Sequence, residues 1–293
     1  MNSCEGTEFD QLSRDADGTP HNGAASMIRA RRLRVGFHRM FFAWAALLTA
    51  TVRAVHAAPP APGSPQTLMF GQHRIEWRGA VRGAPTGDEV PVFLQTNRGQ
   101  IPGRYHPAPA GSARKNQGVI LVSGAGGGVE GPARGLYPDV AQRLQAMGIG
   151  SLRLDYRKPQ DLNGCVLDTL CGVAFFAGEG VSRVVLVGHS FGGGVVIAAG
   201  ASSPRVRAVV PMASQTFAGL QMAPYLAPRA MLLIHGTRDK VLPVSNARKI
   251  YEAAGQPKEL KLFEDAGHGL GHARQDILEL LLQWIPRQLS RSG

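Results

Sequence analysis

Three short segments carry side chains that together could perform nucleophilic catalysis. The first, Gly188-His-Ser190-Phe-Gly192, lies between an apolar run and an Ala/Val-rich run. A serine hydroxyl is a weak nucleophile until a turn exposes it and a base accepts its proton. The G-x-S-x-G pattern between a strand and a helix builds such a turn, in which Gly188 and Gly192 leave room for the backbone. Ser190 is therefore the predicted nucleophile.

The acid that would orient the base is predicted at the end of a later strand. Asp239 follows the apolar run 231–235, where a carboxylate can accept from an imidazole N–H and stabilise the imidazole's cation. Asp155 also ends a strand, but it precedes the serine. In triads whose serine lies in a G-x-S-x-G turn between a strand and a helix, the acid follows the serine along the chain and the histidine comes last. We expect Asp155 to form an ion pair with Arg153 or Arg157 instead.

The base is predicted on the loop before the last helix. His268 is flanked by glycines there, so the loop can bring its imidazole to both the hydroxyl and the carboxylate. His272 is the nearest rival. His189 lies inside the turn that carries the serine, and its side chain is expected to point away from the path of attack, in a packing or supporting role. Asp265 is expected to support the histidine turn.

A glycine-rich segment offers hydrogen-bond donors for a developing oxyanion. It covers residues 123–131 and follows the apolar run 119–122. Two preorganised backbone N–H groups stabilise such an oxyanion by several kcal/mol. One donor is predicted at Phe191, after the nucleophile, and the other at Ala125, with Gly126 as the alternative. A phosphate-binding loop would need a following Lys-Ser or Lys-Thr pair, which this segment lacks.

These segments belong to an alternation of strands and helices. Antiparallel strands are expected at 67–77 and 89–96, followed by strands at 119–122, 150–156, 183–188, 205–212, 231–235 and 260–263. Helices are expected between them, ending with a helix over 275–285 that Pro286 terminates. This order predicts an α/β fold, a mostly parallel doubly wound sheet of about eight strands with helices on both faces. The chain between residues 212 and 231 is too short for a large cap domain.

Two of the three cysteines lie in the predicted domain. Cys165 and Cys171 fall within 163–176, which reads as one helix. Six residues of helix separate Cα atoms by about 9 Å, whereas a disulfide tolerates about 7 Å. A disulfide would therefore need the helix to begin after Cys165, and two buried free thiols are the alternative. Cys4 belongs to the N-terminal leader.

The first 57 residues read as a leader. Five arginines in 27–39 precede a 13-residue apolar segment that begins at Met40, and small residues follow up to Ala57. Thirteen helical residues reach about 20 Å, short of the roughly 30 Å of hydrocarbon in a bilayer. The segment 40–57 therefore predicts a signal peptide of an exported (periplasmic or secreted) protein, with no stable membrane span after cleavage and translation starting at Met27.

Composition excludes several classes of protein. With 44% hydrophobic and 18% charged residues, the chain is globular rather than disordered. The net charge of +11 comes mainly from arginines spread along the chain, without a nucleic-acid-binding motif, so no nucleic-acid partner is predicted. The arginine surplus leaves anionic substrates open. No His, Cys and Asp cluster has metal-ligand spacing, so neither a metal nor a cofactor is predicted.

The chain resembles an α/β-hydrolase from about residue 68 to its end, after a Pro-rich linker over 58–67. The segments similar to the lidless, dienelactone-hydrolase-like members are 152–157, 188–193, 235–239 and 266–268. Dienelactone hydrolases carry Cys where this chain has Ser190, which favours general ester cleavage over dienelactone cleavage. Ser123 stands where lipases and esterases of the HGGG type have His.

The predicted function is that of a serine hydrolase with a small-molecule substrate. Ser190, His268 and Asp239 would cleave carboxylic esters or thioesters of small acyl groups through an acyl-enzyme. Two alternatives remain open. A non-catalytic binding module can use the same fold, usually after losing a member of the triad. A peptidase or acyltransferase would keep the triad and differ only in its pocket.

Overall fold

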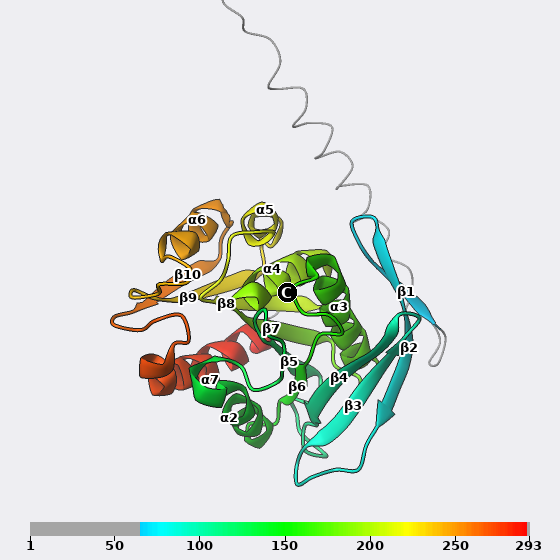
Figure 1. The fold of residues 1–293 in the computed structure, drawn as a ribbon. Coiled ribbons are helices and arrows are strands. Elements are labelled where there is room, and N and C mark those ends of the chain that lie inside the picture. Colours follow the sequence, from blue (N-terminus) through cyan, green and yellow to red (C-terminus); the bar gives the residue numbers. More distant parts are fainter. Residues whose placement is uncertain (1–64, 292–293) are drawn as a thin grey trace, which may run out of the picture. The chain divides into compact units, whose positions relative to one another are not determined.

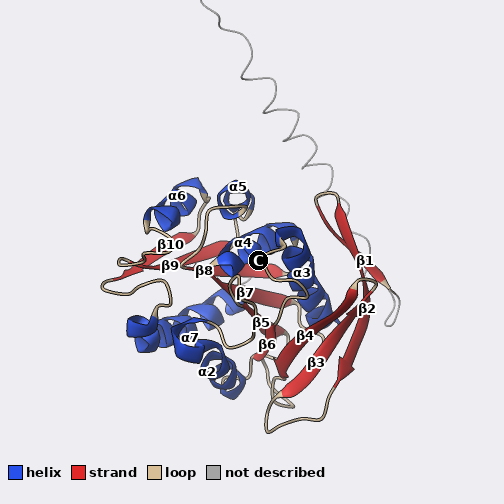
Figure 2. Ribbon diagram, in the orientation of Figure 1, coloured by secondary structure: helices blue, strands red, loops and turns tan. Residues whose placement is uncertain are grey.

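The computed structural model describes residues 65–291, in which strands alternate with helices (Figures 1 and 2). The strands are β1 (Gln66–Phe70), β2 (His73–Arg82), β3 (Val90–Thr96), β4 (Gly99–His106), β5 (Gln117–Val122), β6 (Gly150–Leu154), β7 (Arg183–His189), β8 (Val206–Met212), β9 (Ala230–Gly236) and β10 (Lys258–Phe263). The helices are α2 (Pro132–Ala146), α3 (Leu162–Gly178), α4 (Phe191–Ser202), α5 (Gly219–Met222), α6 (Ser245–Ala253) and α7 (Arg274–Ser290), with the 3-10 helices η2 (Ala223–Tyr225) and η3 (Gly271–Ala273).

All ten of these strands belong to one sheet, in the order β1-β2-β3-β4-β6-β5-β7-β8-β9-β10. Strands β1 to β4 pair antiparallel, and β4 joins β6 antiparallel. From β6 to β10 all neighbours are parallel, with Val119 of β5 opposite Val185 of β7. Parallel strands end at the same edge, so the loops after β5, β7, β9 and β10 meet there.

The parallel strands are buried on both faces. In β5, Ile120 packs with the core that includes α3 and α4, whereas its neighbour Leu121 packs with the core that includes α2 and α7. Leu186 and Val187 divide between the same two cores in β7. Alternate side chains point to opposite faces of a strand, so these continuous apolar runs give the sheet two cores, each covered by helices. The predicted α/β-hydrolase fold without a large cap is confirmed for the described residues.

The described sheet has ten strands, two more than the approximate number predicted. A turn at Gly71, whose φ is 57°, separates β1 from β2 where one strand over 67–77 was expected. The hairpin partner of β3, Gly99–His106, was missed altogether. Its sequence contains two glycines and Pro102 and therefore has low strand propensity, and pairing with β3 and β6 on its two sides compensates.

The last helix is longer than predicted, because α7 continues through Pro286 to Ser290. A proline in a helix interior removes one backbone hydrogen bond and costs about 3 kcal/mol or more. Ile285 and Leu289 are both fully buried, and this packing holds the turn around the proline in place. Helix α2 ends at a glycine: Gly148, with φ of 83°, follows directly after its cap Met147.

Helix α3 begins at Leu162, three residues before Cys165. Both Cys165 and Cys171 are buried free thiols inside this helix. The alternative without a disulfide is therefore confirmed, for the geometric reason given above.

The predicted leader and most of the Pro-rich linker lie outside the described residues, and export stays a prediction. Strand β1 begins at Gln66, so the predicted domain limit at residue 68 falls within the first strand. No helix within residues 65–291 is long and apolar enough to span a bilayer.

Candidate active site

Ser190 occupies the sharp turn between β7 and α4. Its φ of 56° and ψ of −117° lie in a region that L residues rarely adopt. Its backbone N–H donates to the Met212 carbonyl (2.8 Å), and its carbonyl accepts from the Gly193 N–H (3.0 Å). The neighbouring strand and the first turn of the helix thus hold Ser190 in a strained conformation that exposes its hydroxyl.

The two glycines of the elbow are required by close backbone contact. A Cβ on Gly188 would overlap the Gly192 carbonyl, and a Cβ on Gly192 would overlap the Ser123 carbonyl. Both obstacles are backbone atoms, which cannot rotate away as a side chain can. The predicted role of Gly188 and Gly192 thus has a physical basis in the contacts of the turn.

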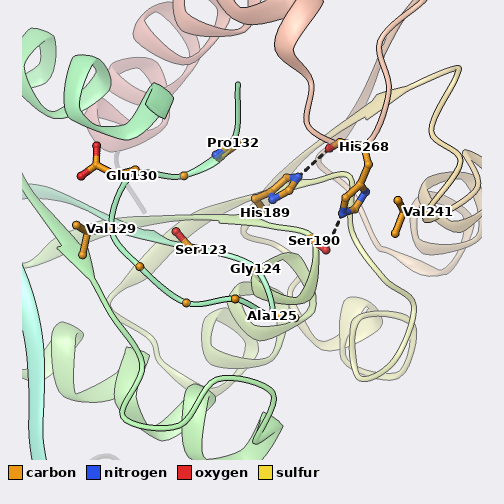
Figure 3. A pocket seen from close by; sticks show the side chains of 14 residues that line it. Ser123, Gly124, Ala125, Val129, Glu130, Pro132, His189, Ser190, Val241 and His268 are labelled. Atoms are coloured by element: carbon orange, nitrogen blue, oxygen red, sulfur yellow. Dashed lines mark hydrogen bonds between the residues drawn. The ribbon is translucent and has the colours of Figure 1, made fainter. Parts of the chain in front are cut away.

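Ser190, His268 and Asp239 form one chain of hydrogen bonds (Figure 3 shows the histidine and serine). The Nδ1 of His268 lies 2.8 Å from Oδ2 of Asp239, and its Nε2 lies 2.9 Å from Oγ of Ser190. With an ionised carboxylate, Nδ1 must carry the proton and donate, which leaves Nε2 free to accept from the serine hydroxyl. The three predicted residues are thus brought together from the loops after β7, β9 and β10.

The Asp239 carboxylate is fully buried and rich in donors. Its Oδ1 accepts from the Val241 N–H (2.9 Å) and the Leu242 N–H (2.8 Å), while Oδ2 faces His268. Burial alone would raise the pKa of Asp239, but these hydrogen bonds outweigh burial and hold the pKa below its ordinary value. His235 lies beneath, with Nε2 bound to the Leu242 carbonyl (2.9 Å) and 3.3 Å from Oδ2. The carboxylate therefore stays ionised and oriented.

The glycine-rich loop packs directly against the elbow. A Cβ on Gly124 would come within 3.2 Å of the Ser190 Cβ, so Ala125 follows at the position next to the nucleophile. Among the described residues, neither the Ala125 nor the Gly126 amide donates to another backbone group. Phe191 is the first residue of α4 and has no helical partner for its N–H. Unpaired donors therefore lie directly after Ser190 and on the loop packed against it, the two positions predicted for the oxyanion donors, and the choice between Ala125 and Gly126 stays a prediction.

Asp155 holds this loop, which corrects the ion pair predicted for it. Its Oδ1 accepts from the Gly128 N–H (2.7 Å) and from the Tyr156 N–H (2.9 Å). The two arginines beside it bind other acids: Arg157 pairs with Asp168, and Arg153 pairs with Glu89 and Glu130. The signal for this role was the position of Asp155 at a strand end beside the strand that leads into the glycine-rich loop.

His189 lines the pocket, and its imidazole is bound to the backbone of the histidine loop (Figure 3). Its predicted direction away from the path of attack stays a prediction. Its Nε2 lies 2.9 Å from the His268 carbonyl, to which it donates, and the two imidazole rings are 4.9 Å apart. Burial lowers the pKa of His189 to about 4, so it is neutral at neutral pH. This hydrogen bond to the backbone of His268 gives His189 a supporting role, because it helps to hold the loop that carries the base.

Hydrogen bonds also join the histidine loop and the helix after it to the start of α2, directly after the glycine-rich loop. Ala133, Arg134 and Gly135 have φ values of 52°, 59° and 80° at the start of α2, which is a strained left-handed turn. The Ala133 N–H donates to the Gly269 carbonyl (2.7 Å), and the Arg274 guanidinium donates to the Ala133 carbonyl (2.6 Å). No sequence pattern indicated this turn, because it depends on contacts between residues more than 130 positions apart.

The two remaining candidates from the sequence lie outside the hydrogen-bond chain. His272 is an exposed residue of η3. Asp265 forms a surface ion pair with Arg238 (2.7 Å) and has a φ of 59°, which agrees with its predicted role in the turn.

The pocket beside Ser190 has a volume of about 640 Å³. The glycine-rich loop forms one side of it, and His189, His268 and Val241 line the rest (Figure 3). Within residues 65–291, no group of three or more His, Cys, Asp or Glu side chains is arranged to hold a metal ion.

Comparisons with known proteins agree with this fold. Residues 141–279 match the dienelactone hydrolase family, a range that contains Ser190, Asp239 and His268. A dienelactone hydrolase from Anabaena variabilis superposes with a TM-score of 0.60 at 21% identity, over 69% of this chain and 98% of its own. A serine hydrolase without a lid from Xanthomonas campestris gives a TM-score of 0.55 at 16% identity, over 72% and 100%.

A relative in sequence is an uncharacterized protein of Mycobacterium tuberculosis, 23% identical over 241 residues, which are 71% of this chain and 81% of that protein. The family match supports an enzyme of the hydrolase class. The chain therefore has the fold of the α/β-hydrolases, and its residues 141–279 resemble the dienelactone hydrolase family.

Proposed function

We propose that the protein is a serine hydrolase that cleaves carboxylic esters or thioesters of small acyl groups. The observation that carries the proposal is the continuous chain from Ser190 Oγ through His268 to Asp239, at 2.9 and 2.8 Å. Donor distances near 2.6–3.2 Å are those at which a base can take a proton from a nucleophile. Unpaired amides beside the same hydroxyl supply the other requirement of acyl transfer.

The reaction proceeds in two half-reactions. Ser190 Oγ attacks the acyl carbon while its proton passes to Nε2 of His268, and the carbonyl oxygen becomes an oxyanion facing the Phe191 and Ala125 amides. The bond to the leaving group then breaks, and His268 returns the proton to the departing oxygen or sulfur. Water repeats the sequence on the acyl-enzyme and releases the acid. Asp239 remains ionised throughout and stabilises the imidazolium.

Two alternatives use the same fold. In a non-catalytic binding module, nothing would preserve the strained φ of Ser190 or the hydrogen bonds that keep Asp239 ionised, because neither is needed to bind a ligand. A peptidase or acyltransferase would use the same triad with a different pocket. The described domain has no large cap, but this does not distinguish ester cleavage from peptide cleavage or acyl transfer. The substrate panel below separates these reactions.

Labelling with a fluorophosphonate tests the proposal directly. The wild-type protein should be labelled at Ser190, and Ser190→Ala should not be labelled. A panel of short-chain p-nitrophenyl esters, acyl thioesters and peptide amides should then show ester or thioester turnover well above amide turnover. Absence of labelling in a folded protein would support the binding module, and amide turnover that exceeds ester turnover would support the peptidase.

We also propose that the protein is exported and cleaved after Ala57. The basic run before Met40 and the apolar segment after it support this proposal. Mass spectrometry of protein from the extracytoplasmic fraction should find an N-terminus at Ala58. Peptides from residues 1–26, or a mature cytoplasmic chain that retains residues 40–57, would contradict it.

A further inference from the structure

The side of the pocket formed by the glycine-rich loop presents backbone and few functional groups. Glycines at 124, 126, 127, 128 and 131 contribute no side chains, and Pro132 adds an apolar ring. Arginine and lysine do not occur among the lining residues of the described region, although the whole chain has a net charge of +11. The arginine surplus is thus placed outside the pocket lining, and among the described lining residues no Arg or Lys side chain could pair with a substrate carboxylate.

The charge next to the pocket is negative. Glu130 is its only lining carboxylate in the described residues, and 66% of its side chain is exposed. Its partner Arg153 is buried and is shared with the carboxylate of Glu89. Asp155 lies behind Gly128 at 2.7 Å. A substrate carboxylate next to Glu130 would be repelled by its like charge, and Arg153, which is already bound by Glu89 and Glu130, is not free to pair with it.

Val241 forms the opposite side, next to the base. Its N–H donates to Oδ1 of Asp239 (2.9 Å), which fixes its backbone. The residue is 67% exposed, and it lines the pocket with His268 (Figure 3). The imidazole of His268 must give its proton to the departing oxygen of the substrate. The alcohol part of an ester therefore lies on the His268 side of the pocket, where Val241 offers it an apolar surface.

We infer that this site takes uncharged esters with an apolar alcohol part and that Val241 is the residue that selects this part. The inference rests on the proposed esterase function and names its substrate class. In the step concerned, the Ser190 Oγ–acyl carbon bond forms, the acyl carbon–alcohol oxygen bond breaks, and the proton from Ser190 reaches that oxygen through His268. Val241 contacts only the group that leaves.

The test compares acetate esters of methanol, butanol and hexanol, which form the same acetyl-enzyme and have alcohols of similar acidity. The ratio of kcat/KM for hexyl acetate to that for methyl acetate therefore reports the contact with the alcohol. Loss of one methylene contact in an enclosed pocket changes kcat/KM by roughly 10-fold or more. At this open wall we expect Val241→Ala to lower the ratio about 3- to 10-fold. Val81→Ala is the matched control, since Val81 is 56% exposed on β2, outside the pocket.

Two further arms make the test specific. Methyl hexanoate and methyl acetate differ only in their acyl group. Val241→Ala should leave the ratio of kcat/KM for these two esters within about twofold of the wild-type ratio. The acetate ester of 4-hydroxybutanoate should react at least about 10-fold more slowly than butyl acetate, and Glu130→Gln should narrow that gap. The inference would be overturned if the anionic ester reacted faster than butyl acetate, or if Val241→Ala lowered kcat/KM equally for methyl acetate and hexyl acetate.

The failure of this inference can be told from failure of the proposed function. If Ser190 reacts with the fluorophosphonate and methyl acetate is cleaved, but alcohol length has no effect, the preference for an apolar alcohol and its assignment to Val241 are wrong, whereas the proposed function stands. If neither labelling nor turnover occurs in the folded protein, the proposed function is wrong and the inference falls with it.

Discussion

Replacing Ser190 by glycine and by alanine should separate the strain of the elbow from its chemistry. Both variants lose the hydroxyl and its hydrogen bond to His268, so that loss cancels when they are compared. Ser190→Ala keeps a Cβ at φ 56° and ψ −117°, whereas glycine adopts this region without strain. A residue in such a conformation costs about 1–3 kcal/mol. Glycine also makes the unfolded chain more flexible than alanine does, which lowers the free energy of unfolding by about 0.5–1 kcal/mol and offsets part of the relieved strain.

The glycine variant should therefore be more stable than the alanine variant by up to about 2.5 kcal/mol, with a middle value of about 1 kcal/mol. For a domain of this size, each kcal/mol shifts Tm by about 2–4 °C, so the glycine variant should have a Tm higher by about 2–4 °C at the middle value and by up to about 10 °C. Differential scanning calorimetry at neutral pH measures it, with urea unfolding as the second reading. Loss of fluorophosphonate labelling in both variants provides the control that the nucleophile has been removed.

A lower Tm for Ser190→Gly than for Ser190→Ala would refute the reasoning. It would mean that the backbone at this turn carries little strain, so that only its hydrogen bonds to Met212 and Gly193 hold the nucleophile in position. A higher Tm would mean that folding stability is given up to expose the hydroxyl, as is common at active sites.

Three other predictions follow from the same contacts. Asp239→Asn should lower kcat for ester cleavage by roughly 10³–10⁴-fold with little change in KM, because an amide facing Nδ1 favours the wrong tautomer of His268; a loss below tenfold would contradict this. The pKa of His189 is about 4 in the folded protein and 6.5 ordinarily, so between these pH values the unfolded chain binds a proton that the folded chain excludes, and stability falls as pH drops. In urea titrations from pH 7 to 4, the free energy of unfolding should therefore fall by about 1–3 kcal/mol less in His189→Gln than in the wild type. Equal declines in the two proteins would refute this. Gly188→Ala should destabilise the fold by about 1–3 kcal/mol through overlap with the Gly192 carbonyl, whereas Gly178→Ala, with open space at its Cβ, should not; similar Tm values for the two would contradict the steric argument.

The positions of Ser190, Asp239 and His268 could be predicted because each is marked by a local pattern at a strand end. The chain folds the apolar runs before them into parallel strands, and parallel strands bring their carboxyl ends to one edge. The hydrogen-bond partner of the His189 side chain could not be predicted in the same way. It is decided by a hydrogen bond to a carbonyl 79 residues later, and nothing near His189 in the sequence encodes that distance.

Asp155 shows the same limit from another side. Its place at a strand end was recognised, but two neighbouring arginines made an ion pair the obvious expectation. In the fold, Arg157 turns to the buried Asp168, and Asp155 is left to accept from the Gly128 amide. Which of several charges pair depends on burial, because a buried carboxylate such as Asp168 needs a partner far more than an exposed one does.

The contacts around the base imply that the three functional loops are fixed as a unit. Two successive carbonyls of the histidine loop are bound by different elements. The His268 carbonyl accepts from the His189 imidazole of the elbow, and the Gly269 carbonyl accepts from the Ala133 amide in the first turn of α2, directly after the glycine-rich loop. The distance from Nε2 to Oγ is therefore set by backbone anchors on both sides and not by the triad side chains alone. A hydrogen-bond chain held only by its own side chains would lengthen when any loop moved, whereas this one requires the elbow, the glycine-rich loop and the histidine loop to move together. The strain at Ser190 and at Ala133 is located at these anchors, where the surrounding contacts are dense enough to maintain it.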